Sequence, residues 1–358
     1  MNALPAHWYR DPTTVALERA RIFDRGWQLL AHASRLRHAG DHVVVDCAGL
    51  PVIAVRDADV DGAPGPVRAF HNVCRHRAGP IALCDGQAAK SLRCRYHGWN
   101  YGLDGRLKSA PEMDQAEHFD TGEIRLPRLD VREWQGLVFA ADASRAMPIE
   151  QVVAGIDARI GDARGLPAYA GHRRASYDIA CNWKVYVDNF LEGYHLPHVH
   201  PGLNRVLDYR SYRTELAEWH ALQWSPLESG PALYGNGDAL YYWLWPNTML
   251  NLLPGRLQTN RVLPVGVDRC RVEFDTYYAP GAESAADADQ AFSDEVQAED
   301  IAICEAVQRG LASGSYTTGP LNPLRETAVH HFHQRLRAAY DETQPQDADC
   351  ADRADKSA

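Results

Sequence analysis

The sequence has no excess of basic residues and no long apolar run. It contains 37 Lys and Arg against 47 Asp and Glu, for a formal net charge of −10. A nucleic-acid-binding surface needs clustered Lys and Arg, and we find no such cluster. The longest apolar stretches, such as 240–245 and 249–253, are far shorter than the roughly 20 residues that span a bilayer. We therefore expect neither a nucleic-acid nor a membrane partner.

The N-terminus lacks both the basic flank and the apolar core of a signal peptide, which predicts a cytoplasmic location. The eight cysteines are spread along the chain, and without an export signal this argues against a disulfide framework. Only Cys74 and Cys94 have the spacing of metal ligands. We expect the others to be small buried residues or inert thiols.

The order of β-rich and helical patterns predicts two domains of the α+β class. A short helix begins at Asp11-Pro12, and between 42 and 142 short β-rich runs alternate with Gly, Pro and Asp turns. Helical periodicity returns after Pro148. Further elements are expected at 175–179 (strand), 183 to about 194 (helix), 241–245, 249–253, 258–263 and 271–278 (strands), and 287–311 (helix).

These patterns divide the chain into four segments. They are an N-terminal helical segment that packs on the larger domain (1–35), a small antiparallel β-domain (36–147), a larger domain whose antiparallel sheet is enclosed by helices (148–343), and a flexible polar tail (344–358).

Two short motifs each offer one thiolate and one imidazole. They are Cys74-Arg-His76 and Cys94-Arg-Tyr-His97, with residues 77–93 between them. A Rieske [2Fe–2S] cluster binds one iron through two Cys and the other through two His, so each of two facing loops supplies one ligand to each iron. A structural zinc site can use the same four ligands, but its usual form groups Cys with Cys and His with His. The spacing favours the Rieske cluster, and Cys84, which has no paired His, is given no ligand role.

A second polar group lies between residues 182 and 200. Asp188, Glu192 and His195 are spaced i, i+4 and i+7, which predicts one face of a helix. Pro197 is expected to end that helix and to turn the following residues into a loop. The alternative for such a stripe is a solvated surface.

A non-haem Fe(II) site needs two His and one carboxylate, with open positions for O₂ and substrate. His198 and His200 are both candidates for the second histidine. The best candidate for the carboxylate is Asp300, which shares a predicted helical face with Cys304 and Val307. An unpaired carboxylate among apolar neighbours is costly, and a cation would relieve that cost. The alternative is an ordinary exposed acidic turn.

Taken together, these segments resemble the α subunits of Rieske non-haem iron oxygenases. The resemblance rests on the cluster loops ending in Tyr96-His97-Gly98-Trp99, on residues 188–200, and on Glu299-Asp300 with 308–311. It extends from Trp27 to the His-rich segment 330–333, and it is closest to choline and carnitine monooxygenase-like members. It implies a Rieske antiparallel β-domain and a helix-grip catalytic domain with a central antiparallel sheet.

The resemblance also implies residue roles. His195, His200 and Asp300 would be the ligands of a mononuclear non-haem iron(II), with His198 as the alternative second histidine. Glu192 would be the acid that links the cluster of one subunit to the iron of the next in a homotrimer. Its neighbours in the same motif, Asp188 and Asn189, are assigned to the catalytic group.

The substrate is the least defined part of the prediction. Tyr241, Trp243 and Trp245 alternate along one predicted strand face, which could hold a flat ring or surround a quaternary ammonium group. Asn251 could add a polar contact, and so could Asn260. The alternative is that these aromatic residues mainly pack the core.

The predicted function is a terminal oxygenase that uses O₂ to hydroxylate or oxidatively demethylate a small organic substrate, with a quaternary amine as one candidate. The chain has no G-x-G-x-x-G fingerprint for a flavin or nicotinamide, so electrons from NAD(P)H would arrive through a separate reductase or ferredoxin. The alternatives are an aromatic-ring-hydroxylating dioxygenase and, in another class, a Rieske electron carrier or a non-catalytic binding protein.

Overall fold

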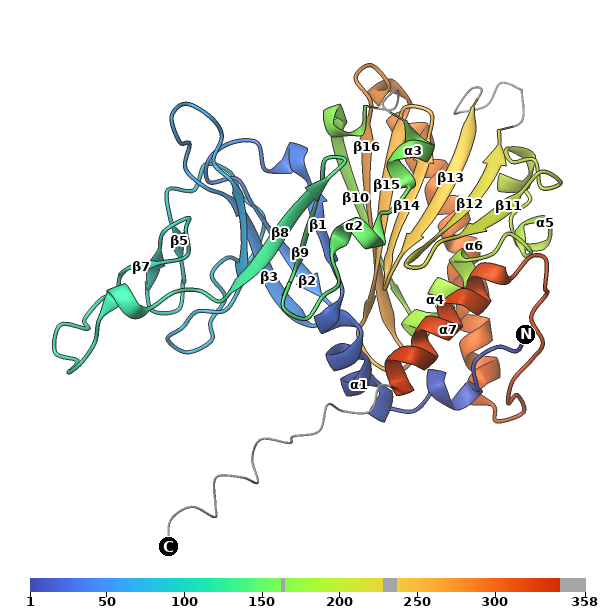
Figure 1. The fold of residues 1–358 in the computed structure, drawn as a ribbon, viewed down its shortest axis with the longest axis horizontal. Coiled ribbons are helices and arrows are strands. Elements are labelled where there is room, and N and C mark those ends of the chain that lie inside the picture. Colours follow the sequence, from blue (N-terminus) through green and yellow to red (C-terminus); the bar gives the residue numbers. More distant parts are fainter. Residues whose placement is uncertain (162–164, 228–236, 342–358) are drawn as a thin grey trace, which may run out of the picture.

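The computed structural model describes residues 1–161, 165–227 and 237–341, so the whole of the predicted tail 344–358 and its boundary lie outside the described residues. Two β-rich bodies lie side by side (Figure 1). The smaller contains the strands before α2, and the larger contains the strands from β10 onward together with the long helices. The predicted α+β class with antiparallel sheets is confirmed.

The smaller body is built on a six-stranded antiparallel sheet in the order β1-β9-β8-β4-β3-β2. Buried and more exposed residues alternate along β2, where Val43, Val45 and Cys47 are buried while the residues between them are not. Ala48 and Gly49 both have positive φ and join β2 to β3 in a tight hairpin. The strands are β1 (Gln28–His32), β2 (His42–Cys47), β3 (Leu50–Arg56), β4 (Val67–His71), β8 (Arg128–Trp134) and β9 (Leu137–Ala141).

A three-stranded sheet extends this body at its far end from the helices (Figure 1). Its strands are β5 (Leu92–Arg93), β6 (Asn100–Tyr101) and β7 (Leu107–Ser109). A separate core holds this small sheet against the six-stranded sheet, with Phe70 from β4 packed among Trp99 and Tyr101. Cys74 and Cys94 belong to this core, so both predicted thiolate ligands are anchored by apolar packing.

The larger body contains a seven-stranded antiparallel sheet in the order β10-β16-β15-β14-β13-β12-β11. The expected strands are all present, and β11 and β12 add two more at one edge. The strands are β10 (Ala170–Ile179), β11 (Arg213–Leu216), β12 (His220–Pro226), β13 (Asp238–Leu244), β14 (Thr248–Leu253), β15 (Arg256–Pro264) and β16 (Cys270–Tyr278).

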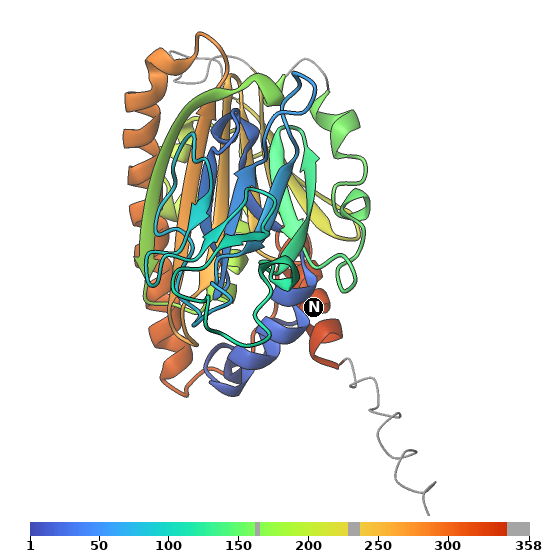
Figure 2. The same cartoon turned by 90° about the vertical axis from the view of Figure 1, so that its left-hand side faces the viewer.

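The two faces of this sheet bury different partners. One face packs on the smaller body and on two short helices, α2 (Ile149–Val152) and α3 (Ile156–Ile160). The other face packs on the remaining helices, and Figure 2 shows α6 running along the length of the sheet. These are α4 (Trp183–Phe190), α5 (Leu196–Val199), α6 (Ala286–Ala312) and α7 (Thr327–Asp341). The site residues discussed below lie between this second face and its helices.

The N-terminal segment contains the predicted helix and one unexpected strand. In α1 (Thr13–Arg21) the buried side chains are Thr14 and Glu18, whereas Val15 is exposed. Glu18 can be buried because it is paired with Lys184 of α4. In addition, β1 lies within the predicted segment 1–35 but pairs with β9 of the smaller body. The other segment boundaries stay a prediction.

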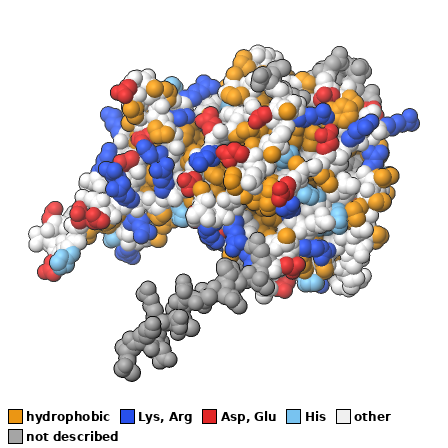
Figure 3. Space-filling view, viewed as in Figure 1, with side chains coloured by type: hydrophobic (Ala, Val, Ile, Leu, Met, Phe, Trp, Pro, Cys, Tyr) orange, Lys and Arg blue, Asp and Glu red, His pale blue; other side chains and the backbone are white. Residues whose placement is uncertain are grey.

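Two surface properties bear on partners. None of the helices in the described ranges is long and apolar enough to cross a membrane. On the face seen in Figure 3, basic and acidic side chains are interspersed over both bodies.

Candidate metal centres and catalytic cavity

The two cluster motifs form loops of the same local geometry. Cys74 donates its backbone N–H to the carbonyl of Gly79 at 2.8 Å, and Cys94 donates to the carbonyl of Trp99 at 3.0 Å. Each loop is thus closed by a hydrogen bond between a residue and the fifth one after it. Gly79 lies against the other loop, where an added Cβ would be 3.2 Å from Cys94 Sγ. Local backbone closure therefore brings the two motifs face to face.

The four predicted cluster ligands split into a buried and an accessible pair. Cys74 and Cys94 are buried, and the Tyr101 hydroxyl lies 3.2 Å from Cys74 Sγ. His76 Nδ1 and His97 Nδ1 face each other at 3.1 Å, and the His76 ring stacks on Trp99. Burial raises the pKa of the Cys94 thiol, and partial desolvation together with His76 and Arg77 lowers the pKa of His97. Two adjacent thiols and two facing imidazole nitrogens are the donor set that a Rieske cluster requires.

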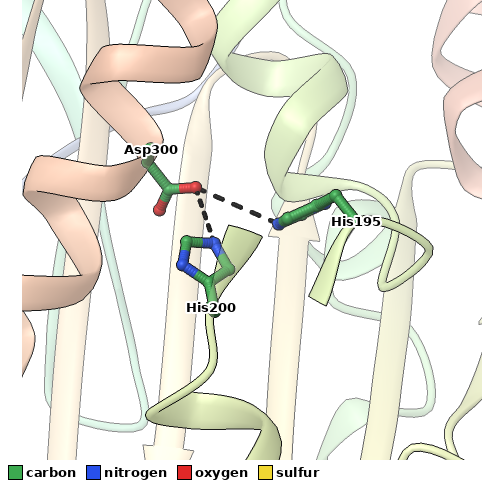
Figure 4. Close-up of side chains that lie close together, drawn as sticks. All are labelled: His195, His200 and Asp300. Atoms are coloured by element: carbon green, nitrogen blue, oxygen red, sulfur yellow. Dashed lines mark hydrogen bonds and ion pairs between the residues drawn. The ribbon is translucent and has the colours of Figure 1, made fainter. Parts of the chain in front are cut away.

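A second donor set forms where α5 meets α6. His200 Nε2 lies 3.0 Å from Asp300 Oδ1, and His195 Nε2 lies 4.0 Å from the same oxygen (Figure 4). One ligand atom from each of the three residues falls within 4.8 Å of the others. Two imidazole nitrogens and one carboxylate make up the two-His, one-carboxylate arrangement of non-haem iron(II) sites.

Each member of this triad is held by a further polar side chain. Glu192 Oε1 lies 2.5 Å from His195 Nδ1, Glu299 Oε2 lies 2.7 Å from His200 Nδ1, and Asn189 donates to Asp300 Oδ1 at 2.6 Å. A carboxylate on Nδ1 fixes the tautomer that leaves Nε2 free for a metal. The sequence pattern did not predict the role of Glu299, although its position directly before Asp300 is a signal.

Charge around the triad also favours a cation. Burial lowers the pKa of His200, but hydrogen bonds and charge from Asp300 and Glu299 outweigh it and leave the pKa raised. The side chain of His200 is 1% exposed. A buried site with this much negative charge is suited to a divalent metal ion.

The predicted helix from 183 to about 194 is shorter than expected. α4 ends at Phe190, so Asp188, Glu192 and His195 do not share one helical face. The Glu192 carboxylate accepts backbone N–H groups from Tyr194 and from His195, which turns the chain into α5. Glu192 therefore acts like a helix cap, and this local bonding replaces the helical continuation.

Pro197 also has the opposite role to the predicted one. It lies in the first turn of α5, a position that suits proline because its missing N–H is not needed there. The short helix places His195 at its beginning and His200 at its end. His198, the alternative second histidine, is exposed and lies outside the triad.

A cavity of about 120 Å³ opens beside the triad. Tyr241 and Asn251, two of the predicted pocket residues, line it. Trp243 and Trp245 are not among its described lining residues, which corrects the prediction for both. Both pack against Phe332 of α7 in the core, because α7 covers that end of the sheet face.

Asp188 lines a second cavity, of about 610 Å³, and Glu192 lines both cavities. Its carboxylate accepts a hydrogen bond from the Tyr9 hydroxyl at 2.6 Å and lies 2.8 Å from His333 Nε2. Burial and the charge of Asp188 raise the pKa of Tyr9 well above its ordinary value. The sequence pattern did not predict that Tyr9, near the N-terminus, and His333 of α7 would both contact Asp188.

The class of the protein follows from these sites and from its relatives. Residues 26–126 match the Rieske [2Fe-2S] domain, and residues 166–342 match the catalytic domain of ring hydroxylating alpha subunits. The chain belongs to the Rieske non-haem iron oxygenases. It is therefore an oxidoreductase whose cofactors are a [2Fe–2S] cluster and a mononuclear non-haem iron, and the zinc and electron-carrier alternatives are set aside.

The relatives it resembles include two enzymes of quaternary amines. It is 34% identical to choline monooxygenase of Arabidopsis thaliana, over 92% of this chain and 81% of that protein. It is 29% identical to the carnitine monooxygenase oxygenase subunit of Escherichia coli (strain K12), over 94% and 93%.

Solved structures agree with this placement. A quaternary ammonium Rieske monooxygenase in complex with L-carnitine superposes with a TM-score of 0.82 at 26% identity, over 95% of this chain and 96% of that one. Naphthalene 1,2-dioxygenase superposes with a TM-score of 0.77 at 17% identity, which shows a shared fold alone.

Proposed function

We propose that the protein is the terminal oxygenase component of a monooxygenase that hydroxylates, or oxidatively demethylates, a small quaternary amine. The observation that carries this proposal is the triad of His195, His200 and Asp300 beside a cavity with aromatic walls. Similarity to choline and carnitine monooxygenases supports the substrate class.

In this proposal the triad holds the mononuclear iron, which supplies activation of O₂ when it is bound. Glu192 and Glu299 orient the two imidazoles through Nδ1, and Asn189 orients the carboxylate of Asp300. Asp188, held by Tyr9 and His333, is a positioning residue four positions before Glu192. Cys74, His76, Cys94 and His97 hold the cluster.

The walls of the cavity suit a cation without N–H groups. Phe190, Tyr212, Tyr241 and Phe274 contribute rings to it. Ring faces attract quaternary ammonium groups through their quadrupole, and the attraction grows when the site is desolvated. Tyr241 is neutral at physiological pH, and burial favours the neutral phenol further by raising its pKa to about 12.

Electron supply requires a second chain. Within one chain, the cluster loops lie at the end of the smaller body that points away from α4 and α6 (Figure 1). His76 is exposed there, and Glu192 lines the second cavity. We propose a homotrimer in which the cluster of one subunit docks near Glu192 of the next, as a solved quaternary ammonium Rieske monooxygenase is described with inter-subunit electron transfer.

Electrons would reach the cluster from NAD(P)H through a separate reductase or ferredoxin. The cytoplasmic location and the trimer stay predictions, and size-exclusion chromatography with light scattering tests the trimer.

The proposed function is tested on purified protein by iron content and by product analysis. We expect about three irons per chain, two in the cluster and one mononuclear. Reconstituted with a reductase, the protein should consume O₂ with choline or carnitine and not with simple aromatic acids. Oxidation of aromatic acids alone would make the protein a ring hydroxylase, and two irons per chain in the wild type and in His195→Ala would remove the mononuclear site.

A matched pair of cysteine variants tests the cluster ligands. Cys94→Ser should remove the visible absorption of the cluster, because its thiol is a proposed ligand. Cys84→Ser should leave it unchanged, because Cys84 is exposed and has no paired histidine. The reverse result would overturn the ligand assignment.

A further inference from the structure

A row of polar side chains crosses five strands of the large sheet, and its members on β12 to β15 line the cavity beside the triad. Cross-strand pairing places them next to one another on the same face of the sheet, in an order that runs from β12 to β16. The row is Gln223, Tyr241, Asn251, Gln258 and Thr276. A buried polar row is costly unless its groups are hydrogen-bonded.

Part of this row is bonded within the protein. Asn251 Nδ2 donates to Gln258 Oε1 at 3.1 Å, and Gln258 Nε2 donates to Ser293 Oγ at 3.0 Å. Asn251 is only 9% exposed, yet its Oδ1 accepts no hydrogen bond from any described residue. An unpaired acceptor is therefore left on a residue that lines the cavity.

Two more buried side chains that line the same cavity also carry a polar atom without a hydrogen-bond partner among the described residues. Asn260 is 2% exposed, and its Oδ1 has no partner among the described residues. Gln297 of α6 is 1% exposed. Its Oε1 accepts from the Tyr186 hydroxyl at 2.8 Å, which leaves Nε2 without a partner in the described chain. Because a buried polar atom without a hydrogen bond is costly, three such atoms on residues that line one cavity point to a ligand.

The charge of the cavity limits what that ligand can be. Arg256 supplies the guanidinium among the described lining residues, and its Nε is bound to Asp289 Oδ2 at 2.7 Å. Both partners are buried, so the positive charge of Arg256 is already balanced by Asp289, and a substrate carboxylate would meet no net positive charge there. The free groups are instead two acceptors and one donor, all neutral, and a hydroxyl both donates and accepts.

We propose that Asn251, Asn260 and Gln297 form a neutral polar pole that selects a quaternary ammonium substrate by a hydroxyl at its other end, in preference to a carboxylate. This inference rests on the proposed function, which it narrows. The aromatic walls bind the ammonium group and the polar pole binds the hydroxyl, so both ends of a small substrate are fixed beside the triad.

The test compares substrates that differ at one end. Choline carries the hydroxyl, ethyltrimethylammonium lacks it, and glycine betaine carries a carboxylate. We expect the wild-type protein to favour choline in kcat/KM at least tenfold over both, because losing one hydrogen bond to buried polar groups costs on this order.

Variants then assign the preference to the polar pole. Asn251→Leu and Gln297→Leu should raise KM for choline about tenfold. The kcat for choline and the KM for ethyltrimethylammonium should change less than about twofold. Asn247→Leu is the matched control. Asn247 is 1% exposed and also has an unpartnered Oδ1 within the described residues, but it lies outside the cavity lining. This control should keep the wild-type preference.

The outcomes separate this inference from the function on which it rests. Oxidation of none of the quaternary amines by the wild-type protein would overturn the proposed function and the polar pole with it. Oxidation of ethyltrimethylammonium or glycine betaine as efficiently as choline would overturn the polar pole alone, whether or not the variants fold. Cluster absorption and thermal unfolding report folding of each variant, and a folded Asn251→Leu with wild-type preference would also contradict the polar pole.

Discussion

The two candidate metal centres differ in how their ligands are distributed along the chain. The cluster ligands all lie between Cys74 and His97, in two loops around one short strand. The triad joins His195 and His200 to Asp300, about a hundred residues later on another helix. The first site is assembled by local backbone hydrogen bonds, and the second exists only when α4, α5 and α6 are packed together.

This difference predicts different sensitivities. The cluster loops depend on the core of the small three-stranded sheet, whereas the triad depends on the buried contacts that hold the helices and the N-terminal segment on the large sheet. Changes in those contacts should disturb the triad before they disturb the cluster.

Removing a triad ligand should separate the two centres most sharply. His200→Ala is expected to lower turnover by roughly a thousandfold or more, because several kcal/mol of metal catalysis are lost. Cluster absorption should be unchanged, and iron content should fall by about one per chain. The control is His198→Ala, an exposed neighbour that should keep full activity. Loss of activity in the control and not in His200→Ala would reverse the ligand assignment.

The next prediction probes the packing that supports the triad. Glu18 of α1 forms a buried ion pair with Lys184 of α4 and also accepts from the Trp183 indole N–H at 2.7 Å. Glu18→Ala leaves Lys184 without this partner, and burial already lowers the pKa of that lysine. We expect the free energy of unfolding to fall by about 3–5 kcal/mol in urea titrations.

The matched control for this change lies in the same helix. Arg19 is exposed, so Arg19→Ala should change the unfolding free energy by less than about 0.5 kcal/mol. Equal effects of the two substitutions would show that helix α1, and not the buried ion pair, sets the stability.

A pH titration tests the junction between the two bodies. His32 of β1 is fully buried, and its ring bonds to the carbonyl of Leu166 at 3.0 Å. Burial lowers the pKa of the His32 ring from its ordinary value of 6.5 to about 4, so the folded state disfavours the protonated ring. The stability from the neutral ring is therefore present above pH 6.5 and lost as the pH falls toward 4, by about 3 kcal/mol.

The measurement is the difference in unfolding free energy between the wild-type protein and His32→Gln at several pH values. Glutamine does not titrate, so the difference should narrow by about 3 kcal/mol between pH 6.5 and 4. A constant difference across this range would contradict a buried neutral histidine at the junction.

The smallest expected effect concerns the residue that links the two centres. Glu192→Gln should leave both metals bound and lower turnover roughly 10–100-fold, as is typical when a carboxylate that orients a metal-bound histidine is replaced. Stopped-flow reduction of the mononuclear site should slow by the same factor. Glu295→Gln, an exposed change on α6, is the control. Loss of the mononuclear iron in Glu192→Gln would make Glu192 a ligand.

Much of this site could be predicted because its residue types are chemically restrictive. Paired Cys and His at fixed spacing occur in few kinds of metal site, and alternation along a strand predicted that Tyr241, Trp243 and Trp245 share one face. The pattern could not tell which part of that face is covered by α7, so Trp243 and Trp245 were placed in the pocket when they belong to the core.

Residue periodicity also could not predict local hydrogen bonds that compete with a helix. The i, i+4, i+7 spacing of Asp188, Glu192 and His195 fits a helix well, yet Glu192 bonds to the backbone and turns the chain. The same spacing thus selected His195, a member of the triad, for the wrong geometric reason.

The sequence by itself determined the family, the candidate cluster ligands and the antiparallel α+β architecture, because these depend on local motifs and on residue periodicity. Only the tertiary structure decided how close Asp300 lies to the two predicted histidines, that Glu299 contacts one of them, and that three neutral amides line the cavity. These relations join residues far apart in the chain, and the packing of helices on the sheet is what brings them within hydrogen-bonding distance.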